Sequence, residues 1–175
     1  MKLKIKVKVL IDGCMPVISN NGEWVDLKSA VNVSIVAAQA GVQHQKNGDK
    51  YRDVTMETRY IPLGVAIELP KGFEAIIASR SSTPRNLNLF IPNGIGIVDN
   101  SYNGDKDHWH FICSAMSNTK IAKGDRICQF RIQLSQKSTL WQKLKWLLSS
   151  GIELVEVDNL NNNNNRGGFG STGIK

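Results

Sequence analysis

Short stretches in which apolar and polar residues alternate are the feature that most constrains the fold of this chain. The clearest is KLKIKVKVL at residues 2–10, which puts every second side chain on one face of a strand. Alternating or compact apolar stretches predict strands at residues 2–10, 31–36, 64–69, 73–78, 90–91, 95–98, 109–113, 127–134 and 152–157. Turn sequences such as Pro70-Lys71-Gly72 separate them. Many short strands at close spacing predict an all-β sandwich, barrel or jelly roll.

One segment near residues 139–149 departs from this pattern. Its apolar residues recur at helical spacing, at Leu140, Trp141, Leu144, Leu147 and Leu148. We therefore expect a short inserted amphipathic α-helix that ends at Gly151. Its apolar face either caps the core or forms a docking face for a partner.

The length of the chain suits a single domain. It has 175 residues, 41% of them hydrophobic, which is enough for one core but short for two. We expect a β-domain over residues 1–160 and a flexible C-terminal tail over residues 161–175, because the asparagine run at 161–165 cannot pack and acts as a tether. Residues 43–59 are polar and patternless, which predicts a long loop or a hairpin tip.

Charge and cysteine content indicate the compartment and the kinds of partner to expect for the protein. The N-terminal lysines alternate with apolar residues, so nothing predicts a targeting signal or a membrane span, and we expect no membrane partner. The three cysteines lie far apart without a C-x-x-C pair, which predicts neither a disulfide nor a zinc site and fits a reducing cytoplasm. The formal net charge of +7 favours a polyanion of any kind, including an anionic membrane surface. Aromatic and basic residues do not interleave as in single-strand binders, so we expect no stable binding to nucleic acid.

Two segments carry side chains suited to phosphate chemistry in the middle of the chain. Residues 80–82 (RSS) follow a predicted strand and offer a guanidinium and two hydroxyls. Residues 96–105 form a strand that runs into a tight turn, which presents Asp99 and Tyr102 near the bend. Taken singly, an aspartate such as Asp99 is more often a turn residue, and a tyrosine such as Tyr102 is more often a packing residue.

Two further segments add to them. Gln129 lies where the turn at residues 123–125 enters a strand, and it faces either a phosphate or solvent. Residues 166–173 (RGGFGSTG) combine a cation, glycines, hydroxyls and one aromatic ring. Such a tail can wrap a phosphate chain with its backbone N–H groups and lay the ring on a flat base. On its own, it is also compatible with a disordered end.

In this order, the segments resemble the motifs of the trimeric dUTPase family, which run through nearly the whole chain. The third (G-I-V-D-x-x-Y-x-G), fourth (G-D-R-I-x-Q) and fifth (R-G-G-F-G-S-T-G) motifs are specific, and the second (R-S-S) is moderately so. Residues 24–30 (WVDLKSA) resemble the first motif, with Asp26 matched and Trp24 in place of the usual glycine. The resemblance implies a jelly-roll-like β barrel, a homotrimer, and active sites that draw motifs from more than one subunit.

The resemblance also implies the activity, which is hydrolysis of dUTP to dUMP and pyrophosphate with Mg²⁺. Asp99 would activate or orient the attacking water, and Tyr102 would lie against the deoxyribose and exclude a 2′-hydroxyl. Asp26 would hold the waters of the metal ion. The uracil edge would be bound by Asn93 with the backbone of Ile95, Gly96 and Val98, the phosphates by Arg80, Ser81, Ser82 and Gln129, and the closing tail would supply Arg166, Phe169, Gly170, Ser171 and Thr172.

Three alternatives stay open. Trp109 or Phe111 competes with Phe169 as the ring that stacks on the base, or else packs in the core. A dCTP deaminase shares the fold and an R-S-S segment, but it needs a glutamate on the strand after the third-motif turn, and residues 106–118 contain none. A regulatory protein partner that uses the helix or the 43–59 segment is compatible with enzyme activity.

Overall fold

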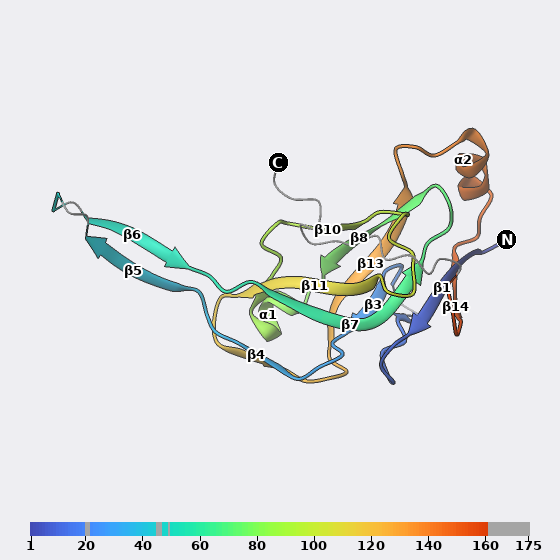
Figure 1. Ribbon diagram of the computed structural model, residues 1–175. Helices are drawn as coiled ribbons and strands as arrows, with labels where there is room; N and C mark the ends of the chain where they lie inside the picture. The colour runs from blue at the N-terminus through green and yellow to red at the C-terminus, as the bar shows by residue number, and fades with distance from the viewer. Residues whose placement is uncertain (20–21, 45–46, 49, 161–175) are drawn as a thin grey trace.

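The computed structural model describes residues 1–19, 22–44, 47–48 and 50–160, apart from the side chains of 42–44, 51 and 52, and most of its regular structure is β-strand (Figure 1). One five-stranded sheet contains, in spatial order, β14 (Ile152–Glu156), β1 (Leu3–Val9), β7 (Arg59–Glu68), β11 (His108–Ala115) and β9 (Leu89–Phe90). A second contains β10 (Gly96–Val98), β8 (Phe73–Ser79), β13 (Arg126–Leu134), β3 (Val25–Lys28) and β2 (Val17–Ile18). Two-stranded sheets pair β12 (Thr119–Ile121) with β4 (Val33–Ile35), and β5 (Gln39–His44) with β6 (Lys50–Thr55).

The core lies between the two large sheets, and it explains the period-two pattern of the sequence. In β1 the side chains of Leu3, Ile5 and Val7 are buried, whereas the intervening lysines reach solvent. Trp109 of β11 meets Phe130 of β13 edge to face, with ring centroids 5.2 Å apart, and so joins one sheet to the other. The predicted all-β fold is confirmed.

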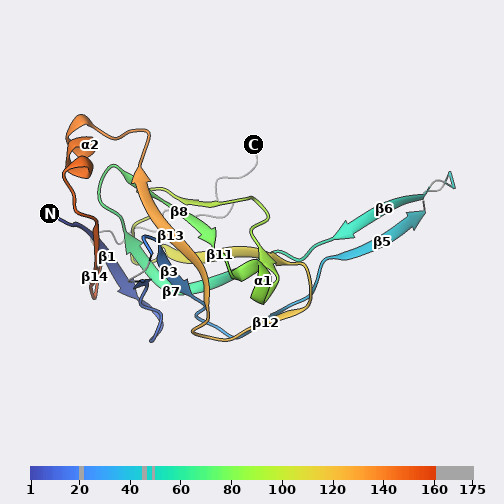
Figure 2. The ribbon, with the colours of Figure 1, turned by 180° about the vertical axis from the view of Figure 1, so that it is seen from behind.

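The strand predictions hold best for the longer strands. Each of the nine predicted stretches overlaps a strand, but the short β2, β3 and β12 and the helix α1 (Thr83–Leu87) were not predicted. They are two to five residues long, which is too short for a period to show. Of the two interpretations of residues 43–59, the hairpin is confirmed, because β5 and β6 form an arm that projects away from the large sheets (Figures 1 and 2).

The predicted inserted helix is present as α2 (Leu140–Leu147), and Thr139 and Gln142 close its N-terminus as a capping box. The expectation that its apolar stripe caps the core is wrong, since Trp141 is 81% exposed and Leu147 is 77% exposed. The helix is fixed to the domain by its other side, where Trp146 packs on Phe73 with ring centroids 5.3 Å apart. Over the ranges that the structure describes, no helix is long and apolar enough to cross a bilayer.

The three cysteines are free and buried, in agreement with the expected lack of a disulfide. Burial raises the pKa of Cys113 to about 12 and raises that of Cys128 well above its ordinary value. We therefore expect the native protein to react with Ellman's reagent at pH 8 roughly 10² to 10³ times more slowly than the urea-unfolded chain, because only the thiolate reacts. Rapid labelling of the folded protein, followed by stopped-flow absorbance, would contradict this expectation.

Candidate active site

A buried carboxylate and two arginines form the most strongly charged cluster of the second sheet. Asp26 on β3 accepts a hydrogen bond from Arg80 Nε at its Oδ1 (2.7 Å) and one from Arg126 Nη1 at its Oδ2 (3.1 Å). The Asp26 side chain is only 7% exposed, whereas that of Arg126 is 49% exposed. A buried carboxylate that holds both guanidinium groups fixes them in place while leaving their outer N–H groups able to bind an anion.

The strand pairing explains how three distant segments supply this cluster. Asp26 on β3 pairs with Gln129 on β13, and Gln129 pairs with Ala78 on β8. Arg80 comes directly after the last residue of β8, two residues beyond Ala78. A register shift between Arg126 and Cys128 marks a bulge in β13, a feature that often re-aims side chains near functional sites. The sequence-based assignment missed Arg126, although it lies within the fourth motif.

A cavity of about 350 Å³ opens beside the two arginines. It is lined by Arg80, Ser82, Thr83, Asn86, Leu87, Gly124, Asp125 and Arg126. The turn that forms one wall is anchored to Ser29, which accepts from the Gly124 N–H and donates to the Asp125 carbonyl, at 2.8 Å each. Polar side chains and two cations around one cavity make it suitable for a phosphate group.

Of the other residues predicted to bind phosphate, Ser82 lines this cavity, whereas Ser81 and Gln129 are not among its lining residues. Ser81 is exposed, and Ser82 is the residue that precedes α1. The Gln129 side chain donates to the carbonyl of Ser79 (3.2 Å), so its amide is already engaged with the end of β8.

The residues predicted to bind the nucleoside lie on β10 and the turn that follows it. Gly96 packs so closely on β8 that a Cβ there would lie 3.3 Å from the Cβ of Ile77. Asp99 accepts hydrogen bonds from both the N–H and the hydroxyl of Ser101, at 2.7 Å each. The Tyr102 hydroxyl donates to the carbonyl of His108 (2.9 Å), and partial burial raises its pKa. Asn93 and Ile95 are exposed in the loop before β10.

The structure does not bring Asp99 and the arginine cluster together within one chain. Across the sheet, β3 with Asp26 is three strands away from β10. Along the strands, Asp26 is level with Ala78 of β8, whereas Val98 of β10 is level with Ala75. Spacings of about 4.8 Å between strands and about 3.3 Å along a strand put roughly 17 Å between Val98 and Asp26. Asp99 lies one residue farther along in the same direction, so the two halves of the predicted site are separate in this chain.

The aromatic residues of β11 are excluded as the ring that stacks on the base. Trp109 and Phe111 are each 1% exposed and belong to the core, so neither can stack on a base. Between them, His110 contacts the carbonyl of His108 through Nδ1 (2.9 Å), and burial lowers its pKa. The tail residues Arg166, Phe169, Gly170, Ser171 and Thr172 lie outside the described residues.

Comparison with known proteins agrees with the fold and the motifs. The dUTPase family model matches residues 49–173. The SPbeta prophage-derived deoxyuridine 5′-triphosphate nucleotidohydrolase of Bacillus subtilis is 41% identical over 154 residues, which cover 88% of this chain and 86% of that protein. The deoxyuridine 5′-triphosphate nucleotidohydrolase of Orientia tsutsugamushi is 27% identical over the full length of both chains.

Two solved structures share the fold. The dUTPase from phage phi11 of S. aureus superposes with a TM-score of 0.59 at 17% identity, over 78% of this chain and 93% of that one. The dUTPase from Streptococcus mutans superposes with a TM-score of 0.57 at 20% identity, over 73% and 91%. Fold, cavity and relatives together place this chain in a class of β-barrel nucleotide hydrolases. Because the family model covers more than half of its length, the chain belongs to the dUTPase family.

Proposed function

We propose that this protein hydrolyses dUTP to dUMP and pyrophosphate with Mg²⁺, by attack of water on the α-phosphorus, as a cytoplasmic homotrimer. The observation that best supports it is the pair of arginines held on buried Asp26 beside a cavity of about 350 Å³. In a family of dUTP hydrolases, such a cavity is suited to the triphosphate of the substrate.

The phosphate groups would bind at Arg80, Ser81, Ser82 and Gln129, and we add Arg126 to this set. Both guanidinium groups are oriented before substrate arrives, so little side-chain entropy is lost on binding. Asp26 thus acts on the substrate through the two arginines, in addition to the contact with metal-bound water expected for it.

The donor set fits a magnesium ion that is held mainly by substrate. Among the described residues there is no group of three His, Cys, Asp or Glu side chains that could hold a metal ion. Mg²⁺ keeps several waters and prefers phosphate oxygens, so Asp26 would contact it only through water. When bound, the ion would neutralise charge on the phosphates. A structure of a phage phi11 dUTPase variant is described as showing coordination of a structural Mg(II) ion.

The segment formed by β10 and the turn after it would bind the nucleoside and supply the general base. Asn93 and the backbone of Ile95, Gly96 and Val98 would bind the uracil edge, with the Tyr102 ring against the deoxyribose. The hydrogen bond from Tyr102 to His108 fixes that ring, which favours steric exclusion of a 2′-hydroxyl. Asp99, oriented by Ser101, would accept a proton from the attacking water.

The separation of roughly 17 Å between the two halves supports a site shared between subunits. The arginine cluster of one chain would face the Asp99 turn of a neighbour, and the tail from residue 161 onward would close over the pair. A symmetric trimer then holds three equivalent sites.

The substrate is tested by release of pyrophosphate from dUTP, dCTP, UTP and dTTP in a coupled phosphate assay. We expect turnover of dUTP alone at a rate typical of an enzyme. Ammonia release from dCTP would instead identify a deaminase, and no turnover of any of the four would leave a binding protein.

Arg126 is tested by replacement with Gln. Loss of one charged hydrogen bond to phosphate, worth about 1.5 to 3 kcal/mol, should raise KM for dUTP by roughly 10- to 100-fold with a smaller change in kcat. Arg126→Lys should restore part of the affinity. Arg131→Gln is the matched control, because Arg131 lies on the same strand but stacks on Trp24. An unchanged KM in Arg126→Gln would remove this residue from the site.

A further inference from the structure

Helix α2 turns its apolar side outward. At 3.6 residues per turn, its large apolar residues other than Trp146 fall within an arc of about 120°. The side chains of this apolar ridge are 73% (Leu140), 81% (Trp141), 38% (Leu144), 77% (Leu147) and 74% (Leu148) exposed. Contiguous exposure of this kind is rare on a soluble protein and marks a surface of interaction.

The opposite side of α2 holds the helix to the domain, so the ridge cannot turn inward. Trp146 packs on Phe73, and a Cβ at Gly72 would collide with the amide of Gln142. The Ser138 hydroxyl donates to the carbonyl of Gly72 (2.6 Å) and fixes the start of the helix. The ridge is therefore presented rigidly.

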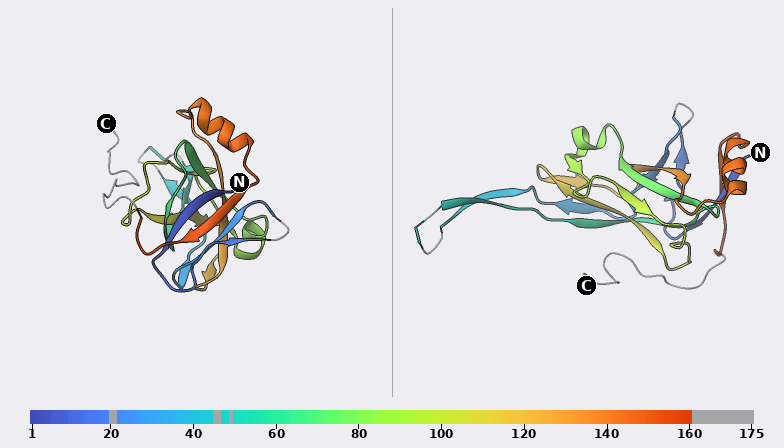
Figure 3. Two further views of the ribbon diagram at one scale, coloured as in Figure 1. Left: turned by 90° about the vertical axis from the view of Figure 1, so that its right-hand side faces the viewer. Right: turned by 90° about the horizontal axis from the view of Figure 1, so that it is seen from above.

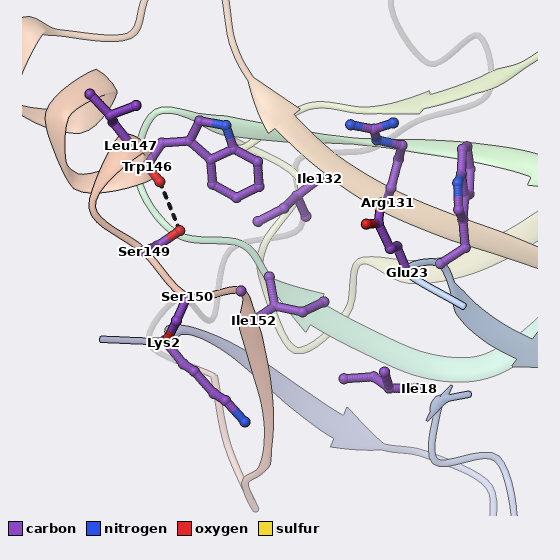
Figure 4. Close-up of a pocket in the computed structure, with 12 residues that line it drawn as sticks. Lys2, Ile18, Glu23, Arg131, Ile132, Trp146, Leu147, Ser149, Ser150 and Ile152 are labelled. Atoms are coloured by element: carbon purple, nitrogen blue, oxygen red, sulfur yellow. Dashed lines mark hydrogen bonds between the residues drawn. The ribbon is translucent and has the colours of Figure 1, made fainter. Parts of the chain in front are cut away.

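The charges around the ridge are positive. At the same helical period, Lys143 and Lys145 each lie about 40° beyond one edge of the apolar arc. The groove beside the helix, about 650 Å³ in volume, has an apolar lining that includes Ile132 and Ile152, with Lys2, Arg131 and the single acidic residue Glu23 (Figure 4). Cations on both sides of an apolar arc that contains a tryptophan are the pattern of helices that lie in a lipid interface.

The position of the helix suits a flat surface. It lies beside the N-terminus, at the end of the molecule opposite the β5–β6 arm (Figures 1 and 3). We propose that α2 docks this end of the protein onto an anionic lipid surface. The apolar ridge would enter the boundary between headgroups and acyl chains, and Lys143 and Lys145 would reach lipid phosphates on either side.

A second copy of the chain suits this face less well. The helix is eight residues long, so about 12 Å of ridge is available, which is little for an interface of about 1,200 Å² or more. Pairing two copies would also bring four lysines together without an acidic partner on the helix.

Co-sedimentation of the full chain with vesicles tests the proposal. We expect binding to phosphatidylcholine vesicles that contain about one third phosphatidylglycerol, weak binding to phosphatidylcholine alone, and release as NaCl approaches 1 M, where the Debye length is about 3 Å. Trp141→Ala/Leu147→Ala and Lys143→Glu/Lys145→Glu should each lower the bound fraction by roughly 10-fold, with dUTP turnover unchanged.

Lys50→Glu/Lys120→Glu is the matched control. It changes the net charge by the same amount as Lys143→Glu/Lys145→Glu, but at exposed lysines of β6 and β12, away from α2. Binding that falls as much in this control as in the α2 lysine variant would show attraction by overall charge and overturn the proposal. No binding to anionic vesicles would overturn it and leave the face to a protein partner. A smaller oligomer in Trp141→Ala/Leu147→Ala, measured by light scattering, would assign the ridge to contacts between chains and also overturn it.

Discussion

Asp99→Asn is expected to lower kcat for dUTP by ~10² to 10⁴, the usual contribution of a positioned general base. Asparagine keeps the shape of the side chain and can still accept from Ser101, so the turn should persist and KM should change little. What is lost is the carboxylate that accepts the proton of the attacking water. Steady-state kinetics with an equilibrium-binding measurement on a non-hydrolysable dUTP analogue separate the two effects.

Asp158→Asn is the matched control for this variant, because it removes an exposed carboxylate outside the motifs. It should turn over dUTP as the unchanged protein does. Wild-type turnover in Asp99→Asn would refute the assignment of the base. Loss of analogue binding in the same variant would show that Asp99 binds substrate and does not act only on the water.

Mixing two inactive variants should restore activity if sites are shared. Arg80→Gln lacks a phosphate ligand and Asp99→Asn lacks the base, so each homotrimer should be nearly inactive. After the two are unfolded and refolded together in equal amounts, about one quarter of the sites would combine an intact Arg80 from one chain with an intact Asp99 from its neighbour. Recovery of roughly that fraction of wild-type activity is expected.

The result distinguishes shared sites from sites within one chain. If Arg80 and Asp99 of the same chain met in one site, every site in the mixture would carry a lesion and no activity would return. Mixing the folded variants without unfolding is the control, since intact trimers would not exchange chains. The same design with a chain that ends at Asn165 in place of Arg80→Gln tests whether the tail also serves a neighbouring site.

Much of the fold and part of the site were predictable from local sequence. Alternation in β1 and β8 fixed which side chains face the core, because successive side chains of a strand point to opposite faces. The motifs placed Asp99, Tyr102 and Arg80 at strand ends and turns. The apolar spacing that predicts α2 and the residues that cap it, Thr139 and Gln142, are all local in sequence, so α2 was predictable as an element.

Only the tertiary structure decided what these elements meet. Arg126 joins Arg80 through Asp26 because a bulge and the β3–β13 register bring together residues 100 positions apart. Trp109 and Phe111 are buried because β11 packs against β13 of the other sheet, although the sequence alone also left a lid over the base open for one of them. Periodicity shows that α2 has an apolar side but cannot show whether anything covers it. That depends on Gly72, Phe73 and Ser138, which hold the helix by its other side, and such non-local contacts leave no periodic trace in the sequence.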